Sequence, residues 1–298
     1  MQARLIVIIV SWNVRRLLLE CLRTLPAGAD GLPLHTVVFD NASSDGTVQA
    51  VRERYPDVEV IASDKNLGFS RANNIVLRKF QHSADYFLLL NPDTVVRPGT
   101  LRIMAEFMGS HPEAGVAGCK IVKPDGTLDW PCKRSYITPS ALFYKACGLD
   151  RMFPNSPRFG RYHLTFLDPD QLHEVDALVG AFMMIRRECL AQIGLLDEAL
   201  FMYGEDLEWC YRAKSAGWRV YYVPAAEIIH YKGQSSGRRS YRMIYWWYHS
   251  TWQTYRKCVG PRYPRAVNVL VWLGFHVMCA GSLVANLLKE NKRVPGRR

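Results

Sequence analysis

The sequence predicts an α/β protein whose mainly parallel sheet is flanked by helices. Within residues 1–122, short apolar runs alternate with longer amphipathic segments, which is the pattern of βαβ units. Polar residues follow four of these runs at their carboxyl ends. Because such ends share one edge of a parallel sheet, we expect the polar residues to converge there and form a binding site.

The individual strands and helices are predicted from the length and periodicity of each segment. We expect strands at 5–10, 36–39, 58–62, 86–90, 115–122, 175–186, 219–223 and 227–230, and helices at 14–24, 47–55, 70–80, 100–110 and 205–216. The first helix should stop near Pro26, because proline cannot donate the backbone hydrogen bond of a helix interior. Ser44 or Asp45 can cap the second helix.

The run at 86–90 predicts the strand around which the other segments are arranged. It is too short for a helix and too apolar for an exposed strand, so it predicts a buried central strand. Pro92 ends this strand, and Asp93 then lies at the edge where open α/β sheets bind ligands. A carboxylate there can hold a divalent cation against a substrate diphosphate. Taken alone, the residues Asn91-Pro92-Asp93 are also typical of a turn without any ligand.

Two later segments are less regular. The stretch at 130–170 contains five prolines and no clear periodicity, and long connections of this kind are often functional. We interpret it as a flap over one side of the site. In the predicted strand at 175–186, Gly180 and Ala181 indicate a point where a ligand approaches the backbone closely.

An acidic cluster opens the last predicted helix, at Glu205, Asp206 and Glu208. Acidic residues suit a helix N-terminus, and this is enough to explain Glu208. Two aromatic residues, Phe201 and Tyr203, come just before the cluster. A carboxylate beside such an apolar wall has a raised pKa and can act as a general base.

The sequence lacks the two common phosphate-binding glycine motifs. It contains no Gly-x-Gly-x-x-Gly and no Gly-x-x-x-x-Gly-Lys-Ser/Thr, which argues against a dinucleotide fold and excludes a P-loop. A glycine-poor site cannot surround a diphosphate with backbone N–H groups, so a metal ion would have to neutralise it, and Asp93 suits this task. His230, at the end of the last predicted strand, is either a core histidine or a further metal ligand.

With these residues placed, the sequence over about 5–235 resembles the inverting glycosyltransferases of family 2, which have the GT-A fold. It is most similar to their rhamnosyltransferase-like branch, which builds bacterial cell-surface polysaccharide. Asn91 departs from the pattern, since many relatives have an Asp there, although this branch commonly has Asn-Pro-Asp. The motifs, each modest alone but specific in this order and spacing, are 10–13 (Val-Ser-Trp-Asn), 39–47 (Phe-Asp-Asn-Ala-Ser-Ser-Asp-Gly-Thr), 66–69 (Asn-Leu-Gly-Phe), 90–93 (Leu-Asn-Pro-Asp), 180–182 (Gly-Ala-Phe), 201–206 (Phe-Met-Tyr-Gly-Glu-Asp) and His230.

The resemblance implies a role for each polar residue. Asp40 would accept the ring N–H of the nucleobase, Asp93 would bind Mg2+ or Mn2+ on the diphosphate, and Asp206 would deprotonate the acceptor hydroxyl. The residues so assigned are Ser11, Asp40, Asn66 and Arg71 for the nucleotide, Asp93 and His230 for the metal ion, Asp206 for catalysis, and Gly180, Ala181 and Glu205 for the sugar and acceptor side.

The implied reaction is a single displacement with inversion at the sugar. The resemblance favours transfer of L-rhamnose from dTDP-rhamnose to a hydroxyl of a lipid-linked or nascent polysaccharide acceptor. One base is enough for this reaction, whereas retention through a covalent intermediate would need a second carboxylate as nucleophile. Three alternatives stay open: the same fold with UDP-hexose or another donor, a sugar-1-phosphate nucleotidyltransferase, and a non-catalytic glycan-binding relative. The nucleotidyltransferase should carry a glycine-rich basic loop after the first strand, which this sequence lacks.

The net charge of +11 is concentrated in the C-terminal part of the chain. Residues 1–231 contain 25 Lys and Arg against 26 Asp and Glu, whereas residues 232–298 contain 13 against 1. We therefore expect a catalytic domain at 1–237 and a basic, aromatic, helical extension at 238–298. Aromatic residues next to Arg and Lys are typical of membrane interfaces, and basic residues attract anionic lipid.

The stretch at 266–288 has no charged side chain and is long enough to span a bilayer. His276 and a few small or polar residues lower its hydrophobicity, so it either lies in the interface or crosses it. A helix packed on the catalytic domain is the remaining alternative. We expect no nucleic-acid partner, because the charges adjoin an apolar run. The eight cysteines show no metal or disulfide spacing, and no signal peptide is evident, so we expect the cytoplasmic face of the inner (plasma) membrane.

Overall fold

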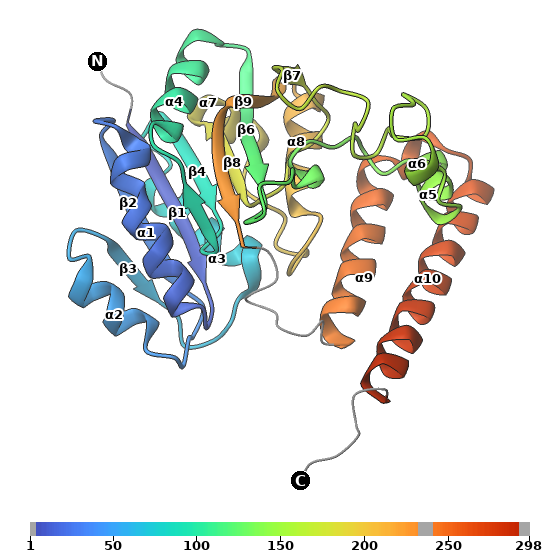
Figure 1. Cartoon of the computed structure of the whole chain (residues 1–298), viewed down its shortest axis with the longest axis horizontal. Helices are drawn as coiled ribbons and strands as arrows, with labels where there is room; N and C mark the ends of the chain where they lie inside the picture. The colour runs from blue at the N-terminus through green and yellow to red at the C-terminus, as the bar shows by residue number, and fades with distance from the viewer. Residues whose placement is uncertain (1–3, 232–240, 292–298) are drawn as a thin grey trace.

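The computed structural model describes residues 4–231 and 241–291, with side chains as far as Leu287. Helices cover both faces of one large sheet, and two long C-terminal helices lie beside it (Figure 1). The expected boundary between 237 and 238 falls outside the described residues. The division of the chain into two parts therefore stays a prediction.

The sheet contains nine strands in the order β3-β2-β1-β4-β8-β6-β9-β5, and β7 pairs with β9. The strands are β1 Leu5–Ser11, β2 Leu34–Asp40, β3 Glu59–Ala62, β4 Tyr86–Leu90, β5 Thr94–Val96, β6 Ala114–Val122, β7 His173–Glu174, β8 Phe182–Arg186 and β9 Arg219–His230. The α-helices are α1 Arg15–Ala29, α2 Thr47–Arg54, α3 Gly68–Phe80, α4 Thr100–Ser110, α5 Pro139–Ala146, α6 Leu149–Met152, α7 Arg187–Ile193, α8 Glu205–Ser215, α9 Tyr241–Cys258 and α10 Arg265–Asn291, with short 3-10 helices at Trp130–Cys132 and Gly260–Arg262.

The predicted α/β fold with a flanked, largely parallel sheet is confirmed. Strands β3, β2, β1 and β4 run parallel to one another, and β6 runs parallel to β9. Strand β8 is antiparallel to both of its neighbours and joins the two parallel groups. The short strands β5 and β7 are antiparallel to β9.

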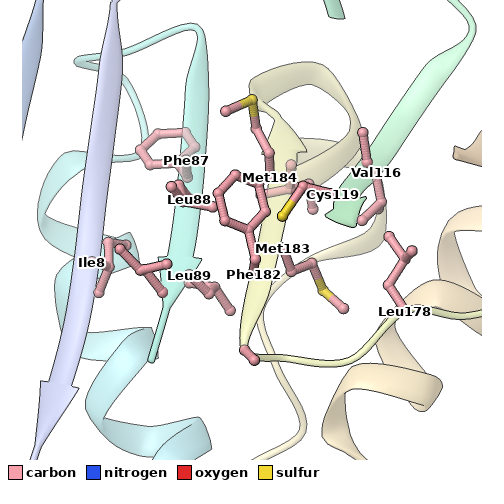
Figure 2. Close-up of a cluster of buried hydrophobic side chains, with 14 of the residues drawn as sticks. Ile8, Phe87, Leu88, Leu89, Val116, Cys119, Leu178, Phe182, Met183 and Met184 are labelled. Carbon is pink, nitrogen blue, oxygen red and sulfur yellow. The ribbon is translucent and has the colours of Figure 1, made fainter. Parts of the chain in front are cut away.

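The core lies where β4 and β8 pass through the middle of the sheet (Figure 2). Phe87, Leu89, Phe182 and Met184 are at most 1% exposed. Fully burying a side chain of this kind stabilises the fold by roughly 1.5–3 kcal/mol. This tightly packed core supports the ends of β1, β2 and β4 and so positions the polar residues that follow them.

The expected stop of the first helix at Pro26 is wrong, because α1 continues to Ala29. Asp30 N donates to Pro26 O at 3.2 Å and closes the last turn. Gly28 in this turn packs so closely on β5 that a Cβ there would lie 2.5 Å from Val96 Cγ1. This packing against β5 offsets the hydrogen bond that proline removes.

Three other segments differ from the prediction. Gly180 and Ala181 lie in a turn before β8, because the ladder to β4 starts only at the pair Leu90–Phe182. The two strands expected at 219–230 are one strand, β9, with a bulge that absorbs three extra residues between Val223 and Glu227. The segment expected to be irregular, 130–170, contains helices α5 and α6.

The C-terminal helices are in contact with the rest of the protein. Helix α9 packs against α8, and its residues Tyr255 and Cys258 belong to the same buried core as the sheet. Helix α10 packs along α9. Within the described residues, the segment Arg265–Leu287 of α10 is the one helix long and apolar enough to cross a membrane, and little of it is buried.

Candidate active site

Ser11 and Asp40 form a buried polar corner at the ends of β1 and β2, where the strand register pairs them. They are 0% and 2% exposed. Asp40 Oδ2 accepts a hydrogen bond from Ser43 N at 2.8 Å. Asp40 Oδ1 and Ser11 Oγ are buried with no hydrogen-bond partner among the described residues. Buried polar atoms without partners are rare, so this corner is suited to a ligand that carries a ring N–H.

The other two predicted nucleotide contacts, Asn66 and Arg71, are exposed near this corner. Asn66 Oδ1 accepts from Gly68 N at 2.9 Å and shapes the turn into α3. Arg71 Nε lies 3.6 Å from a carboxylate oxygen of Glu198. Asn41, at the end of β2, donates to Gly68 O at 3.2 Å. The α3 turn is therefore fixed beside the Ser11–Asp40 corner, while Arg71 remains open to solvent.

A second polar cluster, at the end of β4, contains the predicted metal residues Asp93 and His230. Strands β5 and β9 bring them together, and His230 Nε2 lies 3.2 Å from Asp93 Oδ1. Asn91 Nδ2 is 3.4 Å from the same nitrogen. On the other side of the ring, His230 Nδ1 is 3.6 Å from Asp129 Oδ2. The ring is thus placed between two buried carboxylates.

These charges control the protonation of His230. Burial by itself lowers the pKa of a histidine. The carboxylates of Asp129 and Asp93 outweigh burial and raise the pKa of His230 to about 9. At neutral pH, His230 therefore carries its proton unless a metal ion displaces it.

The donor atoms of this cluster fit a divalent cation. A carboxylate and a neutral imidazole are both ordinary ligands for Mn2+, so an ion bound at His230 would displace the ring proton. Mg2+ is commonly bound by one or two carboxylates plus substrate phosphates. Across residues 4–231 and 241–287, no group of three or more His, Cys, Asp or Glu is arranged as a complete metal site. Diphosphate oxygens and water would therefore have to complete the coordination of an ion held by Asp93 and His230.

A third cluster surrounds the predicted base, Asp206, in the first turn of α8. Its Oδ2 accepts from Arg134 Nη2 at 2.6 Å and from Gly180 N at 3.0 Å. Its Oδ1 accepts from Leu207 N at 2.7 Å. Burial disfavours the charge of Arg134, but the Asp206 carboxylate outweighs it, and the pKa of Arg134 is raised. Asp206 is therefore held in a defined position by a buried cation.

The aromatic wall expected beside the acidic cluster stays a prediction. Phe201 packs against Trp246 of α9, at a ring-centroid distance of 5.4 Å. The carboxyl group with a raised pKa is that of Glu205, whose burial is the larger cause and the negative charge of Asp206 the smaller. Glu205 Oε2 is also buried without a hydrogen-bond partner in the described part of the chain.

The backbone at 180–181 connects the end of β4 with Asp206. Asn91 N donates to Ala181 O at 3.0 Å, while Gly180 N donates to Asp206. Asn91, two residues before Asp93, is therefore joined to Asp206 through two consecutive residues, although 113 positions separate Asp93 from Asp206 in the sequence. A Cβ at Gly180 would make only ordinary contacts with Phe69 and Asp206, so close packing alone does not require glycine here.

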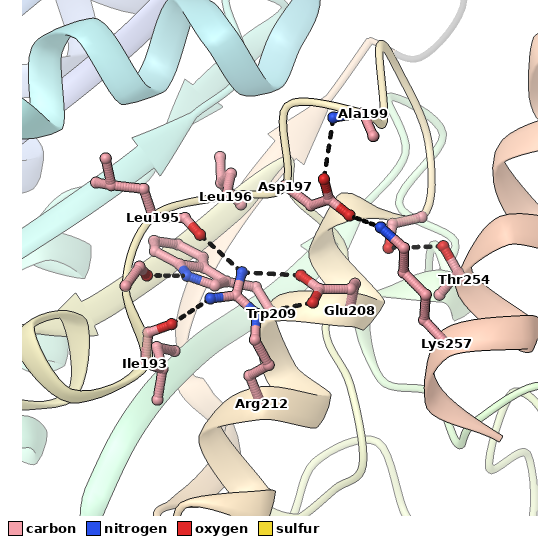
Figure 3. A network of polar contacts seen from close by, with 12 residues as sticks. Ile193, Leu195, Leu196, Asp197, Ala199, Glu208, Trp209, Arg212, Thr254 and Lys257 are labelled. Carbon is pink, nitrogen blue, oxygen red and sulfur yellow. Dashed lines mark hydrogen bonds and ion pairs between the residues drawn. The ribbon is translucent and has the colours of Figure 1, made fainter. Parts of the chain in front are cut away.

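The loop that leads into Asp206 is held by a network of polar contacts (Figure 3). Arg212 of α8 donates to the carbonyls of Ile193 and Leu195 and pairs with Glu208. Lys257 of α9 pairs with Asp197 of the loop. The position of Asp206 thus depends on α8 and on α9 together.

Two residues of these clusters, Asp129 and Arg134, are not identified by the sequence analysis. Both lie in or just before the proline-containing segment, and neither belongs to a recognisable motif. Asp129 reaches His230 because its N–H donates to Ile121 O of β6, which pairs with β9. Arg134 reaches Asp206 because it pairs with Ala177 in an isolated β-bridge. Both residues reach the site through strand pairing, which the sequence pattern does not predict.

The mixed sheet, the carboxylate–imidazole pair at the end of β4 and the second carboxylate near it agree with the glycosyltransferase of the GT-A type that the sequence predicts. The chain belongs to glycosyltransferase family 2, since the family model described as "Glycosyltransferase like family 2" matches residues 3–249. The sequence-based recognition of this family and the prediction that the protein is an enzyme are thereby confirmed.

Curated relatives and solved structures agree with this assignment. The chain is 33% identical over 218 residues to N-acetylglucosaminyl-diphospho-decaprenol L-rhamnosyltransferase of Mycobacterium tuberculosis, covering 69% of each chain. It is 27% identical to rhamnosyltransferase WbbL of Escherichia coli K12, covering 76% of this chain and 82% of the relative. Among solved structures, mannosyltransferase PcManGT of Pyrobaculum calidifontis, in complex with GDP-Man and Mn2+, has a TM-score of 0.61 at 18% identity, with 99% of this chain and 77% of that chain covered.

Proposed function

We propose that this glycosyltransferase moves L-rhamnose from dTDP-rhamnose, with inversion, to a hydroxyl of a lipid-linked glycan acceptor. The names of the rhamnosyltransferase relatives from M. tuberculosis, E. coli and Shigella flexneri support the sugar, and the last of these names supports the nucleotide. The observation that carries the proposal is the connection of Asn91, two residues before Asp93, with Asp206 through residues 180–181. It supports a common site in which Asp93 would bind the cation and Asp206 would accept the proton.

The donor would bind along the ends of β1, β2 and β4. The nucleobase would bind at Ser11 Oγ and Asp40 Oδ1, which have no hydrogen-bond partner among the described residues. Thymine offers one ring N–H, and the carboxyl group of Asp40 would accept it in a hydrogen bond. The sugar and diphosphate would then extend toward Asp93 and His230.

A divalent cation, Mg2+ or Mn2+, would stabilise the negative charge on the leaving diphosphate when bound by Asp93 and His230. The residues of this chain position the ion and the histidine. Asp129 lies against the Nδ1 side of His230 and so leaves Nε2 facing Asp93. Asn91 lies beside the same nitrogen, which gives a role to the amide that replaces the usual acid.

Asp206 would take the proton of the acceptor hydroxyl. As the acceptor oxygen forms its bond to the anomeric carbon, the bond from that carbon to the diphosphate oxygen breaks, and the nucleotide leaves with the electron pair. Arg134 and Gly180 N orient Oδ2 of Asp206. Glu205 beside it, with its raised pKa, would supply a neutral carboxyl group on the sugar and acceptor side.

The acceptor is proposed to be lipid-linked because the M. tuberculosis relative is named for a decaprenol-diphosphate substrate. Helix α10 supports this, since it is apolar, long enough to span a bilayer and little buried. We assign the protein to the anionic cytoplasmic face of the inner membrane, with α10 lying in the interface or crossing it. Nucleic acid is not a proposed partner.

A thermal-shift panel of nucleotide sugars, with and without Mn2+, tests the donor and the metal together. We expect dTDP-rhamnose with Mn2+ to give the largest rise in Tm and to support transfer to a lipid-linked N-acetylglucosamine acceptor. A larger shift and faster transfer with UDP-hexose or GDP-mannose would replace rhamnose as the donor sugar. The absence of transfer with every donor would refute the proposal.

A further inference from the structure

A groove between α9 and α10 lies outside the clusters described above. It has a volume of about 620 Å3 and lies where the two helices meet the short helix Gly260–Arg262. We call it the α9–α10 groove. Its main lining residues are Trp252, Tyr255, Arg256, Arg265, Asn268 and Trp272.

The floor of the groove is fixed by hydrogen bonds and ring contacts. Tyr255 Oη donates to Asn268 Oδ1 at 2.7 Å, and Asn268 Nδ2 donates to Gly260 O at 3.0 Å. Trp252 stacks on Tyr255 at a centroid distance of 5.6 Å and contacts Phe275 at 6.2 Å. The groove is therefore preformed, which favours ligand binding because little ordering is required.

Two cationic side chains at the groove have no carboxylate partner within 4–231 and 241–287. Arg256 donates to the neutral amide of Gln253 at 2.8 Å, and neither Arg256 nor Arg265 forms an ion pair with any residue that the structure describes. The sequence contains no Asp or Glu between 241 and 287. Arginine beside aromatic rings is well suited to phosphate, which it can bind with two parallel hydrogen bonds.

The groove opens onto an apolar stripe that runs along α10. Val269 lines the groove, and Leu273, Val277 and Val284 follow on the same side of the helix, each 46–71% exposed. From Val269 to Val284 the stripe is about 22 Å long at 1.5 Å per residue. One leaflet of a bilayer contributes about 15 Å of hydrocarbon, so the stripe is long enough to lie along an acyl chain.

We propose that the α9–α10 groove binds the headgroup phosphate of an anionic phospholipid, whose acyl chains lie along the stripe of α10. The inference rests on the proposed membrane association. The joined cationic and apolar surfaces match a molecule that is charged at one end and apolar along its length. A second copy of this chain would bring the same cations to the groove, so charge disfavours it as the occupant. A soluble phosphate compound would leave the apolar stripe exposed.

Vesicle flotation of the full-length protein tests this site. Wild type is compared with Arg256→Gln/Arg265→Gln on vesicles of phosphatidylcholine alone or mixed with phosphatidylglycerol. Near an anionic surface, two arginines contribute a factor of about 30 in binding. We expect a loss of that size on the mixed vesicles and little change on neutral ones. Brominated phosphatidylglycerol should also quench tryptophan fluorescence more strongly in wild type than in the double variant.

The matched control is Arg242→Gln/Arg262→Gln, which removes the same charge from positions that do not line the groove. An equal loss in the control would mean that the arginines act as diffuse charge, and the site would be rejected. It would also be rejected if the groove variant bound like wild type, or if wild type ignored anionic vesicles. Rhamnose transfer to a water-soluble acceptor is measured on the same samples. If the wild-type protein transfers rhamnose but does not bind vesicles, the lipid site is refuted while the proposed activity is retained.

Discussion

Replacing Asp40 by Asn tests how the donor base is recognised. The change keeps the size of the side chain and removes its charge and one acceptor oxygen. In the structure, Asp40 Oδ2 accepts from Ser43 N while Oδ1 is left for the ligand. The amide of Asn has one oxygen only. Whichever way it turns, either the bond from Ser43 or the bond from the base is lost, and an NH2 group then faces another donor.

The expected magnitude follows from this loss of one charge-assisted bond. Hydrogen bonds to charged groups are worth about 1.5–3 kcal/mol, which corresponds to about a 10- to 150-fold rise in the donor Kd. The turnover number at saturating donor should change by less than about threefold, because Asp40 does not touch the reacting atoms in the proposed mechanism.

The assay is titration calorimetry of the donor in the presence of Mn2+, combined with initial rates over a range of donor concentrations. Asp57→Asn is the control, since Asp57 is an exposed acid outside the site. If the donor Kd of Asp40→Asn is unchanged while kcat falls, Asp40 does not read the base, and the assignment of the Ser11–Asp40 corner is refuted.

Three further predictions concern α8 and the loop before it. Asp206→Asn should lower kcat by about 10²- to 10⁴-fold with donor Kd unchanged in calorimetry; full activity would remove the assigned base. Glu205→Gln should raise Tm more at pH 9 than at pH 5. The folded-state pKa of Glu205 is raised, so the wild-type protein loses stability as pH increases from the unfolded-state pKa toward the folded-state pKa. Equal shifts of Tm at both pH values would contradict this. Gly204→Ala should lower the free energy of unfolding by about 2–4 kcal/mol in urea, from left-handed backbone strain plus overlap of the new Cβ with Thr254. Gly126→Ala, also at positive φ but in open space, is its control and should show only the backbone part; equal losses would mean that contact with Thr254 does not matter.

The first half of the fold could be predicted from the sequence because its strands and helices are local patterns. The residues that end β1, β2 and β4 were recognisable as site candidates for the same reason. Pro26 was misleading, since packing of the last turn of α1 on β5 outweighs the local rule. Strand β8 was expected, but its own residues do not indicate that it runs antiparallel between two parallel groups.

The rest of the candidate site depends on long-range pairing. The contact of Asp129 with His230 and of Arg134 with Asp206 follows from how β6, β9 and the segment at 177 pair. The spacing of residues along the chain does not predict such contacts. The partner of Asp206 was missed for a similar reason, because Arg134 comes from a segment that looked irregular.

The bracing of the loop at 195–204 by α9 has a consequence for biosynthesis. Lys257 and Thr254, which hold this loop through Asp197 and Gly204, are translated about fifty residues after Asp206. The sheet and the donor corner can therefore form on the ribosome while the chain is still growing, but the base is secured only after α9 has emerged. Since α10 follows α9 directly, the proposed active geometry would be complete at nearly the same moment as the helix proposed to reach the bilayer, and a nascent chain would have little opportunity to act before then.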